Sequence, residues 1–143
     1  MPSEWSRFYR LLISRQFLPD KYESKKFIFS NLKRIVMFYK KNSNNYKKAF
    51  RGVIYKTLAY GDKTSLGEFL LEKGYIIPNH NHPHEQTGYM ISGRMIFTID
   101  GEKFIAKPGD SWCIPGNVEH SVEVQEDSIV IEVFSPPRED YLP

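Results

Sequence analysis

The pattern of apolar and polar residues changes near residue 50 of the 143-residue chain. Before this point, apolar residues recur at about helical spacing in two segments, FYRLLISRQFL at residues 8–18 and FSNLKRIVMFYKK at residues 29–41. After it, short runs of β-branched and aromatic residues alternate with turn residues. We therefore expect an N-terminal extension over residues 1–48, poorly ordered or folded into short helices, and an all-β domain over residues 49–143.

Several runs in the second part of the chain have the composition of β-strands. They are FRGVIYKTLAY, TSLGEFLLEK, GYMIS, RMIFTI, EKFIA and SIVIEVF, and turn residues such as Gly61-Asp62, Gly74, Gly93 and Pro108-Gly109 follow them. Asp100-Gly101 between two alternating runs is a strong hairpin signal. Short strands at this regular spacing predict a β-sandwich or a β-barrel.

Composition is typical of one soluble domain. The chain is 41% hydrophobic, contains no run of 18 apolar residues, and begins with a charged segment where a signal peptide would be apolar. We expect a cytoplasmic protein without a membrane segment. Cys113 is the single cysteine, which excludes an internal disulfide and a thiolate zinc cluster, and we expect it to be a small buried residue.

Basic residues are concentrated in the N-terminal third. Residues 1–51 hold thirteen Lys/Arg and three Asp/Glu, whereas residues 52–143 hold seven and fourteen, so charges of +10 and −7 give the net +3. A basic arm can bind nucleic acid or an acidic membrane surface. The alternative is a solvated appendage, or sequence upstream of a start at Met37. We favour this alternative, and expect neither nucleic acid nor a membrane as a partner, because no nucleic-acid motif accompanies the scattered charges.

Three of the four histidines lie in the segment HNHPHEQTGYMISG, residues 80–93. His80 and His82 are two positions apart, so on an extended strand their imidazoles point to the same side. Pro83 has no N–H for a strand ladder and favours a bend, which ranks His84 below the other two as a ligand. Taken alone, such a pair belongs more often to a polar loop than to a metal site, and two ligands hold a metal weakly.

Gln86 and His120 are the candidates for the remaining metal ligands. The Gln86 side-chain oxygen is a neutral donor, and His120 is the fourth histidine, in the separate segment IPGNVEHSVEV. Glu85 is a rival carboxylate ligand, but next to Gln86 on a strand it faces the opposite way unless a bulge turns it. Zn, Mn, Fe and Ni all accept nitrogen and oxygen ligands, so the sequence does not identify the ion.

The spacing of these residues resembles the two sequence motifs of the cupin family. The first reads Gly74, five residues, His80-Asn81-His82, three residues, Gln86, six residues, Gly93; most cupins have glutamate in place of Gln86. The second reads Gly109, five residues, Pro115-Gly116-Asn117, two residues, His120; Asn117 replaces the usual glycine and Val124 the usual asparagine.

The resemblance covers about residues 50–143. It implies a double-stranded β-helix, the cupin jelly-roll barrel, in which His80, His82, Gln86 and His120 bind one divalent metal ion. Three imidazoles and an amide are all neutral and leave the double charge of the ion uncompensated. Such a site should attract a small anionic substrate and act as a Lewis acid.

The segment VIEVFSPPREDYL, residues 130–142, is similar, together with residues 80–93, to the KdgF-like pectin-degradation cupins, which open unsaturated uronates to their linear keto forms. The resemblance implies that Glu132, Phe134 and Arg138 take part in catalysis, although the family more often has aspartate at the Glu132 position. Arg138 would pair with the sugar carboxylate, Glu132 would move a proton, and Phe134 would form an apolar wall. The structural alternatives are a surface ion pair of Glu132 with Arg138 and core packing of Phe134.

The prediction is therefore an enzyme, a metal-dependent isomerase or ring-opening enzyme acting on a small sugar acid. One alternative is an oxygen-dependent small-molecule dioxygenase with iron in the same site. The other is a non-catalytic ligand-binding or sensor cupin. Cupins commonly pair through their sheets, and the resemblance therefore also implies a homodimer.

Overall fold

The computed structural model describes residues 26–28, 35–42 and 44–143 of the chain. The chain divides into two units, residues 1–41 and 42–143. The described part contains no helix that is long and apolar enough to cross a membrane.

The first unit contains an antiparallel pair of short strands, β1 (Lys26–Ile28) and β2 (Ile35–Met37), with Phe27 opposite Val36. We predicted a helix over residues 29–41, and this prediction is wrong for Ile35–Met37, which form a strand. Ile35 and Val36 are β-branched and favour an extended backbone, and this local preference prevails over the helical spacing of the apolar residues. The other predicted helix, over residues 8–18, lies outside the described residues.

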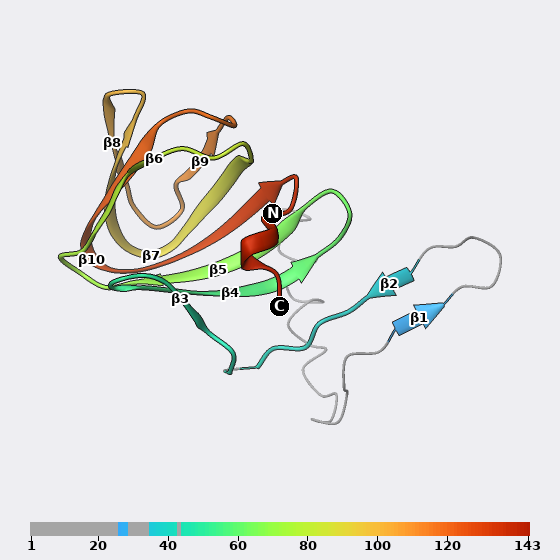
Figure 1. The fold of residues 1–143 in the computed structure, drawn as a ribbon. Helices are drawn as coiled ribbons and strands as arrows, with labels where there is room; N and C mark the ends of the chain where they lie inside the picture. Colours follow the sequence, from blue (N-terminus) through green and yellow to red (C-terminus); the bar gives the residue numbers. More distant parts are fainter. Residues whose placement is uncertain (1–25, 29–34, 43) are drawn as a thin grey trace, which may run out of the picture. The chain divides into compact units, whose positions relative to one another are not determined.

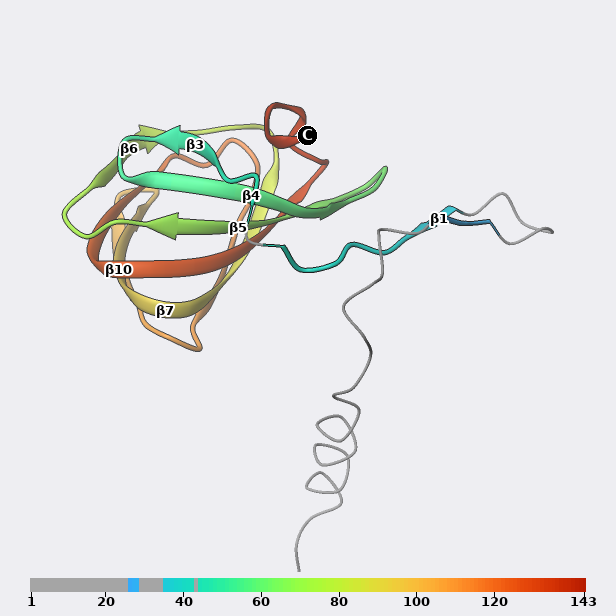
Figure 2. The same ribbon diagram turned by 90° about the horizontal axis from the view of Figure 1, so that it is seen from below.

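The second unit is an antiparallel β-sheet that curls into a barrel, which confirms the all-β prediction (Figures 1 and 2). Its strands are β3 (Lys47–Phe50), β4 (Val53–Tyr60), β5 (Ser65–Leu71), β6 (Ile76–His80), β7 (Glu85–Ile99), β8 (Glu102–Ala106), β9 (Ser111–Ile114) and β10 (His120–Ser135). They pair in the order β3-β4-β5-β10-β7-β8, while β6 also pairs with β10 and β9 with β7. A short 3₁₀ turn, η1 (Glu139–Tyr141), follows the last strand.

The two longest strands, β7 and β10, run through both halves of the barrel. The first half of β10 pairs with β6 and the second half with β5, while β7 lies alongside β10 over nearly its full length. The register between β7 and β10 shifts near Arg94 and Glu126, where both strands bend. Gly93, which we read as a turn between two strands, lies at this bend inside β7 with a φ of 91°.

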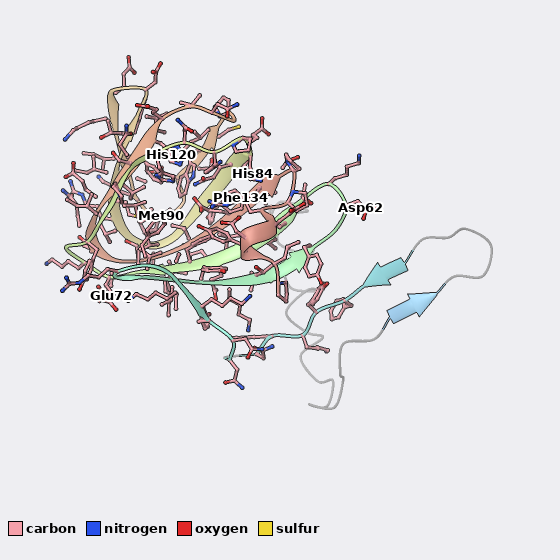
Figure 3. All side chains as sticks on the ribbon, viewed as in Figure 1. Asp62, Glu72, His84, Met90, His120 and Phe134 are labelled. Carbon is pink, nitrogen blue, oxygen red and sulfur yellow. The ribbon has the colours of Figure 1, made fainter. Side chains whose placement is uncertain are left out.

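Alternation of buried and exposed positions produces the core. Along β5 the burial pattern alternates at every residue, and along the second half of β10 Val130, Glu132 and Phe134 are buried while their neighbours are not. Figure 3 shows Met90 and His120 inside the barrel, where they are 0% and 2% exposed. The barrel interior therefore combines an apolar cluster with a few polar side chains, among them His120, Gln86 and Glu132.

Cys113 lies on the outer side of its strand and is exposed, so our prediction of a buried cysteine is wrong. In the pairing of β7 with β9, Cys113 is opposite Thr87, which is exposed as well. The alternation of β9 assigns the inward positions to Trp112 and Ile114 instead. The alternation of inward and outward positions along β9, and not the hydrophobicity of the cysteine side chain, determines that Cys113 is exposed.

Candidate metal centre and its pocket

Three of the four histidines converge at one end of the barrel interior. His80 is the last residue of β6, His120 is the first residue of β10, and the two are direct partners in the strand register. His82 lies in the connection from β6 to β7. One nitrogen from each ring lies within 4.8 Å of those of the other two. Strand pairing thus brings together residues that are about forty positions apart in the sequence.

Each of these histidines is oriented by a backbone carbonyl group. The Nδ1 atoms of His80, His82 and His120 lie 2.9, 3.0 and 2.9 Å from the carbonyl oxygens of Pro78, His84 and Val118, respectively. A carbonyl oxygen only accepts hydrogen bonds, so each Nδ1 carries the proton and each Nε2 presents its lone pair. This arrangement is typical of histidines that bind a metal through Nε2.

Gln86, the second residue of β7, completes the group. Its side chain is 7% exposed, and its Oε1 atom lies 3.0 Å from Nε2 of His82. Burial lowers the pKa of His82, against the opposing effect of this contact, and therefore favours the neutral ring. A neutral ring that donates from Nδ1 has no proton for Gln86, so two electron pairs face each other. A cation bound by both atoms would explain why two unshared electron pairs face each other here.

His120 supplies the second indication of a cation. Its Nε2 atom is buried and has no hydrogen-bond partner in the described structure. Burial also lowers the pKa of His120, so the ring is neutral and this nitrogen is an unused lone pair. Buried polar atoms are rarely left without a partner, and those that are call for an explanation. The residues present thus fit a divalent metal ion held by three imidazoles and one amide oxygen.

The turn before β10 supports the histidine loop directly. The Asn117 N–H donates a hydrogen bond of 2.7 Å to the His82 carbonyl group. Gly116 lies so close to the loop that a Cβ atom there would be 2.4 Å from the Pro83 carbonyl oxygen, which explains a glycine at this position. Asn117, which replaces the usual glycine of the motif, has a φ of 67°, a conformation that asparagine tolerates better than most residues. The departure from the motif therefore leaves the turn intact.

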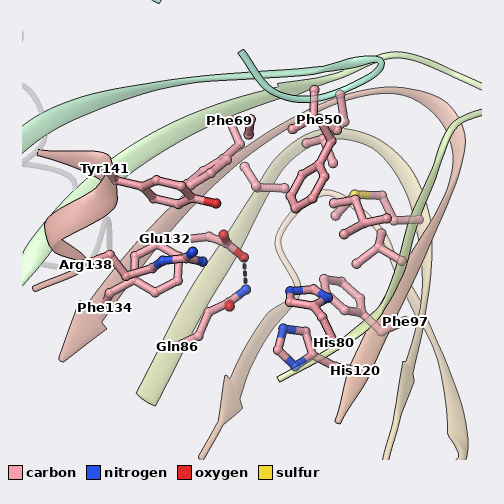
Figure 4. Close-up of a pocket in the computed structure, with 17 residues that line it drawn as sticks. Phe50, Phe69, His80, Gln86, Phe97, His120, Glu132, Phe134, Arg138 and Tyr141 are labelled. Atoms are coloured by element: carbon pink, nitrogen blue, oxygen red, sulfur yellow. Dashed lines mark hydrogen bonds between the residues drawn. The ribbon is translucent and has the colours of Figure 1, made fainter. Parts of the chain in front are cut away.

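Glu132 lies one hydrogen bond away from the candidate ligands. Gln86 donates from Nε2 to Glu132 Oε1 at 2.6 Å (Figure 4), and this bond directs the amide oxygen of Gln86 toward His82. Glu132 is 7% exposed. Burial raises the pKa of its carboxyl group to about 7, although the Gln86 hydrogen bond opposes the shift. A carboxyl group with this pKa can both release and take up a proton at neutral pH.

Arg138 lies at the other end of the pocket and pairs with Asp140, not with Glu132 as in the surface ion pair that we considered. Its Nε and Nη2 atoms donate to the two carboxylate oxygens of Asp140 at 3.2 and 2.7 Å. The guanidinium group lies over the rings of Phe134 and Tyr141, 5.5 and 4.0 Å from their centroids. Among the described residues, only Asp140 accepts hydrogen bonds from the guanidinium group, so Nη1 and the second hydrogen of Nη2 can bind an anion.

Phe134 belongs to the core and to the pocket at once. It is 2% exposed, and its ring contacts those of Phe69, His82 and Tyr141 at centroid distances of 6.1, 5.8 and 5.9 Å. The core packing that we weighed against a catalytic role is thus present, and the same ring forms part of the pocket wall.

The pocket between these groups measures about 500 Å³, including the space open to solvent at its mouth. Figure 4 shows His80 and His120 at one end, Arg138, Phe134 and Tyr141 at the other, and the Gln86–Glu132 pair between them. The remaining wall is apolar and includes Phe50, Phe69 and Phe97. The sequence analysis did not identify Phe50 and Tyr141, because their places depend on where β3 and η1 attach to the barrel.

The two residues that we ranked lower as ligands lie apart from the histidine group. Glu85 is exposed, next to the buried Gln86, as alternation along β7 requires. His84 is half-buried, 5.5 Å from the His82 ring, and its Nδ1 atom is buried without a partner in the described structure. The described groups that could hold a metal include His80, His82 and His120 but not His84.

Comparison with known proteins agrees with this architecture. Residues 67–135 match the cupin domain family. The chain is 34% identical over 93 residues to the pectin degradation protein KdgF of Dickeya dadantii. The matched segment covers 64% of this chain and 84% of that protein. The structure of KdgF from Halomonas sp. superposes with a TM-score of 0.69 at 29% identity, over 73% of this chain and 97% of that one. An RmlC-like cupin from Shewanella frigidimarina gives 0.66 at 26% identity, over 70% and 90%.

The curated relative exceeds 30% identity over most of its own length, and the barrel carries both motifs in register. The chain therefore belongs to the cupin family, and within that family it resembles the pectin degradation protein KdgF.

Proposed function

We propose that this protein is a metal-dependent isomerase that opens the ring of a small unsaturated uronate to its linear keto form. The observation that carries the proposal is the arrangement of one pocket. A set of histidine nitrogens suited to a cation lies at one end, an arginine with a free edge lies at the other, and a buried carboxyl group lies between them. The likeness to KdgF supports the choice of a pectin-derived sugar acid.

The reaction is an isomerisation, so it needs no co-reactant. The bond between the ring oxygen and the anomeric carbon breaks, the anomeric hydroxyl group loses its proton and becomes an aldehyde, and the ring oxygen keeps the bonding electrons as an enolate. The carbon at the far end of the enol double bond then takes up a proton, which gives the ketone. One proton is removed and one is added, and the chain must supply a group that can do both.

Glu132 is the residue suited to this proton transfer. Its pKa of about 7 allows a protonated and an ionised form at neutral pH, and it is shielded from solvent. Arg138 binds the substrate carboxylate through its free edge, because a guanidinium group matches a carboxylate in geometry and charge. Phe134 and the apolar wall exclude water. A bound divalent metal would polarise a sugar oxygen and attract the anion.

The test is an assay on protein loaded separately with Zn, Mn, Fe or Ni. We expect loss of the ultraviolet absorbance of 4,5-unsaturated galacturonate to be faster than in buffer, with no oxygen uptake. Arg138→Ala should raise KM at least about tenfold, because a charged hydrogen bond contributes about 1.5–3 kcal/mol. Lys103→Ala removes the same charge from the surface pair with Glu123 and serves as the control. No acceleration with any of the four metals would contradict the proposal.

A further inference from the structure

The C-terminal turn η1 is attached to two neighbouring strands of the barrel and carries Tyr141 to the pocket. Thr57 Oγ1 donates to the Tyr141 carbonyl oxygen at 2.5 Å, and Lys47 Nζ donates to the Leu142 carbonyl oxygen at 3.0 Å. Within the turn, the Tyr141 N–H donates to the Arg138 carbonyl oxygen at 3.1 Å. Tyr141 and the residue after it are thereby fixed to β4 and β3, respectively.

The ring of Tyr141 is held in one position by aromatic neighbours. Its centroid lies 4.3 Å from that of Tyr55, 5.8 Å from that of Phe69 and 5.9 Å from that of Phe134. The Arg138 guanidinium group covers one face at 4.0 Å from the centroid, a cation–π distance. A tyrosine has few rotatable bonds, so contacts on several sides leave its hydroxyl group little freedom.

The hydroxyl group of Tyr141 points into the pocket, on the side where Glu132 lies (Figure 4). No other described residue of the pocket forms a hydrogen bond with it, in contrast to Tyr46 and Tyr55, whose hydroxyl groups donate to Glu68 and to the Asp140 carbonyl oxygen. Burial raises the pKa of Tyr141 to about 12, against the opposing charge of Arg138. The phenol thus stays protonated at neutral pH and is available as a hydrogen-bond donor.

We propose that Tyr141 is a catalytic residue that donates a hydrogen bond to the ring oxygen of the uronate as this oxygen gains negative charge. The proposal rests on the proposed function. In a uronate, the ring oxygen is bonded to the carbon that carries the carboxylate. A substrate whose carboxylate binds Arg138 therefore has its ring oxygen immediately beside this residue, which is stacked on Tyr141. The phenol keeps its proton throughout, so the reaction stays balanced without it.

The experiment compares Tyr141→Phe with wild type, both in the metal-loaded state. The variant loses one hydroxyl group and keeps the aromatic ring. Removing a donor to a developing oxyanion costs about 10²–10³ in kcat in well-studied enzymes. For the single phenol of Tyr141 we expect kcat to fall about 10- to 100-fold, with KM within about twofold of wild type, because the hydrogen bond strengthens only as charge develops on the ring oxygen.

Tyr55→Phe is the matched control, since it loses the same atom in the same aromatic cluster but does not line the pocket. It should keep kcat within about twofold of wild type. Both variants should retain wild-type metal content and the wild-type Kd for saturated galacturonate, measured by calorimetry. These readouts separate loss of a hydrogen bond from displacement of the turn.

The outcomes distinguish the two proposals. An active wild type with unchanged kcat in Tyr141→Phe, or with a rise in KM alone, overturns the role of Tyr141 and leaves the proposed function standing. Equal losses in Tyr141→Phe and Tyr55→Phe also overturn it, because the effect is then that of the cluster. A wild type that does not convert the unsaturated uronate overturns the proposed function together with the role of Tyr141.

Discussion

Replacing Glu132 with glutamine should stabilise the metal-free protein at neutral and alkaline pH. Burial raises the pKa of this carboxyl group to about 7, from an ordinary value of 4.5. Between these values the unfolded chain releases the proton while the folded protein keeps it. Folded Glu132 therefore contributes most at pH below 4.5, and its contribution is lost as pH rises through about 7.

The size of the effect follows from the two pKa values. Each pKa unit corresponds to about 1.4 kcal/mol, so the gap between 4.5 and about 7 is worth about 3 kcal/mol in total. The glutamine side chain has the same shape, never ionises, and its amide oxygen can still accept the hydrogen bond from Gln86. The free energy of unfolding of Glu132→Gln minus that of wild type should therefore grow by about 2–3 kcal/mol between pH 5 and pH 8.

The assay is urea denaturation of both proteins in the presence of a chelator at pH 5, 6, 7 and 8. Burial lowers the pKa of His82 and His120, so these residues also make stability depend on pH, but they are common to both proteins and cancel in the difference. Glu123→Gln, on the same strand but in a surface pair with Lys103, should differ from wild type by less than about 0.5 kcal/mol at every pH. A Glu132→Gln difference that does not change with pH would refute the reasoning.

Three further predictions concern the metal, the loop and the arginine. His120→Ala should lose nearly all of the metal that elemental analysis finds in wild type, whereas His84→Ala, outside the histidine group, should retain it; equal retention would contradict the site. Gly116→Ala should lower the free energy of unfolding by about 1–3 kcal/mol in urea titrations, because its Cβ would lie 2.4 Å from the Pro83 carbonyl oxygen, whereas Gly61→Ala, with open space, should have little effect. Asp140→Asn should raise KM for the uronate a few-fold, because Arg138 loses the charged partner that holds it at 2.7 Å, and an unchanged KM would show that the aromatic faces alone position it.

The strand rhythm of the second part of the chain predicted its fold, because strands such as β5 and β10 have one buried face and alternation is a local property. The histidine pair and its distance from the second motif likewise predicted the three residues that converge. Gln86 was a candidate because a neutral oxygen donor lies close to the histidine pair, and the resemblance to the cupin motif then assigned it to the ligand set. In these cases, alternation along each strand determines which side of the strand a residue occupies.

Other features depend on contacts that no local pattern contains. β2 pairs with β1, and this partner is not visible in the helical spacing of its apolar residues. The position of Tyr141 in the pocket depends on a hydrogen bond that its carbonyl oxygen accepts from Thr57, a residue 84 positions earlier in the sequence. The sequence analysis predicted that Arg138 binds an anion, a prediction that still has to be tested. Its pairing with Asp140 instead of Glu132 depends on the 3₁₀ turn, which the sequence analysis did not predict.

The position of Glu132 changes what a neutral glutamine means for the candidate metal centre. With Gln86 alone, the ligand set would leave the full double charge of a cation without a negative group nearby. The structure places a carboxyl group one hydrogen bond of 2.6 Å behind the amide, in the interior of the barrel. A glutamate at position 86 would face Glu132 as a second buried carboxyl group, and two such groups in contact repel each other when both are ionised. The amide avoids this conflict, because its N–H group donates a hydrogen bond to Glu132 while its oxygen can offer a lone pair to a cation. Glutamine at the candidate ligand position and an acidic residue on the last strand are therefore one arrangement, in which the negative charge is held on a group that can also exchange a proton.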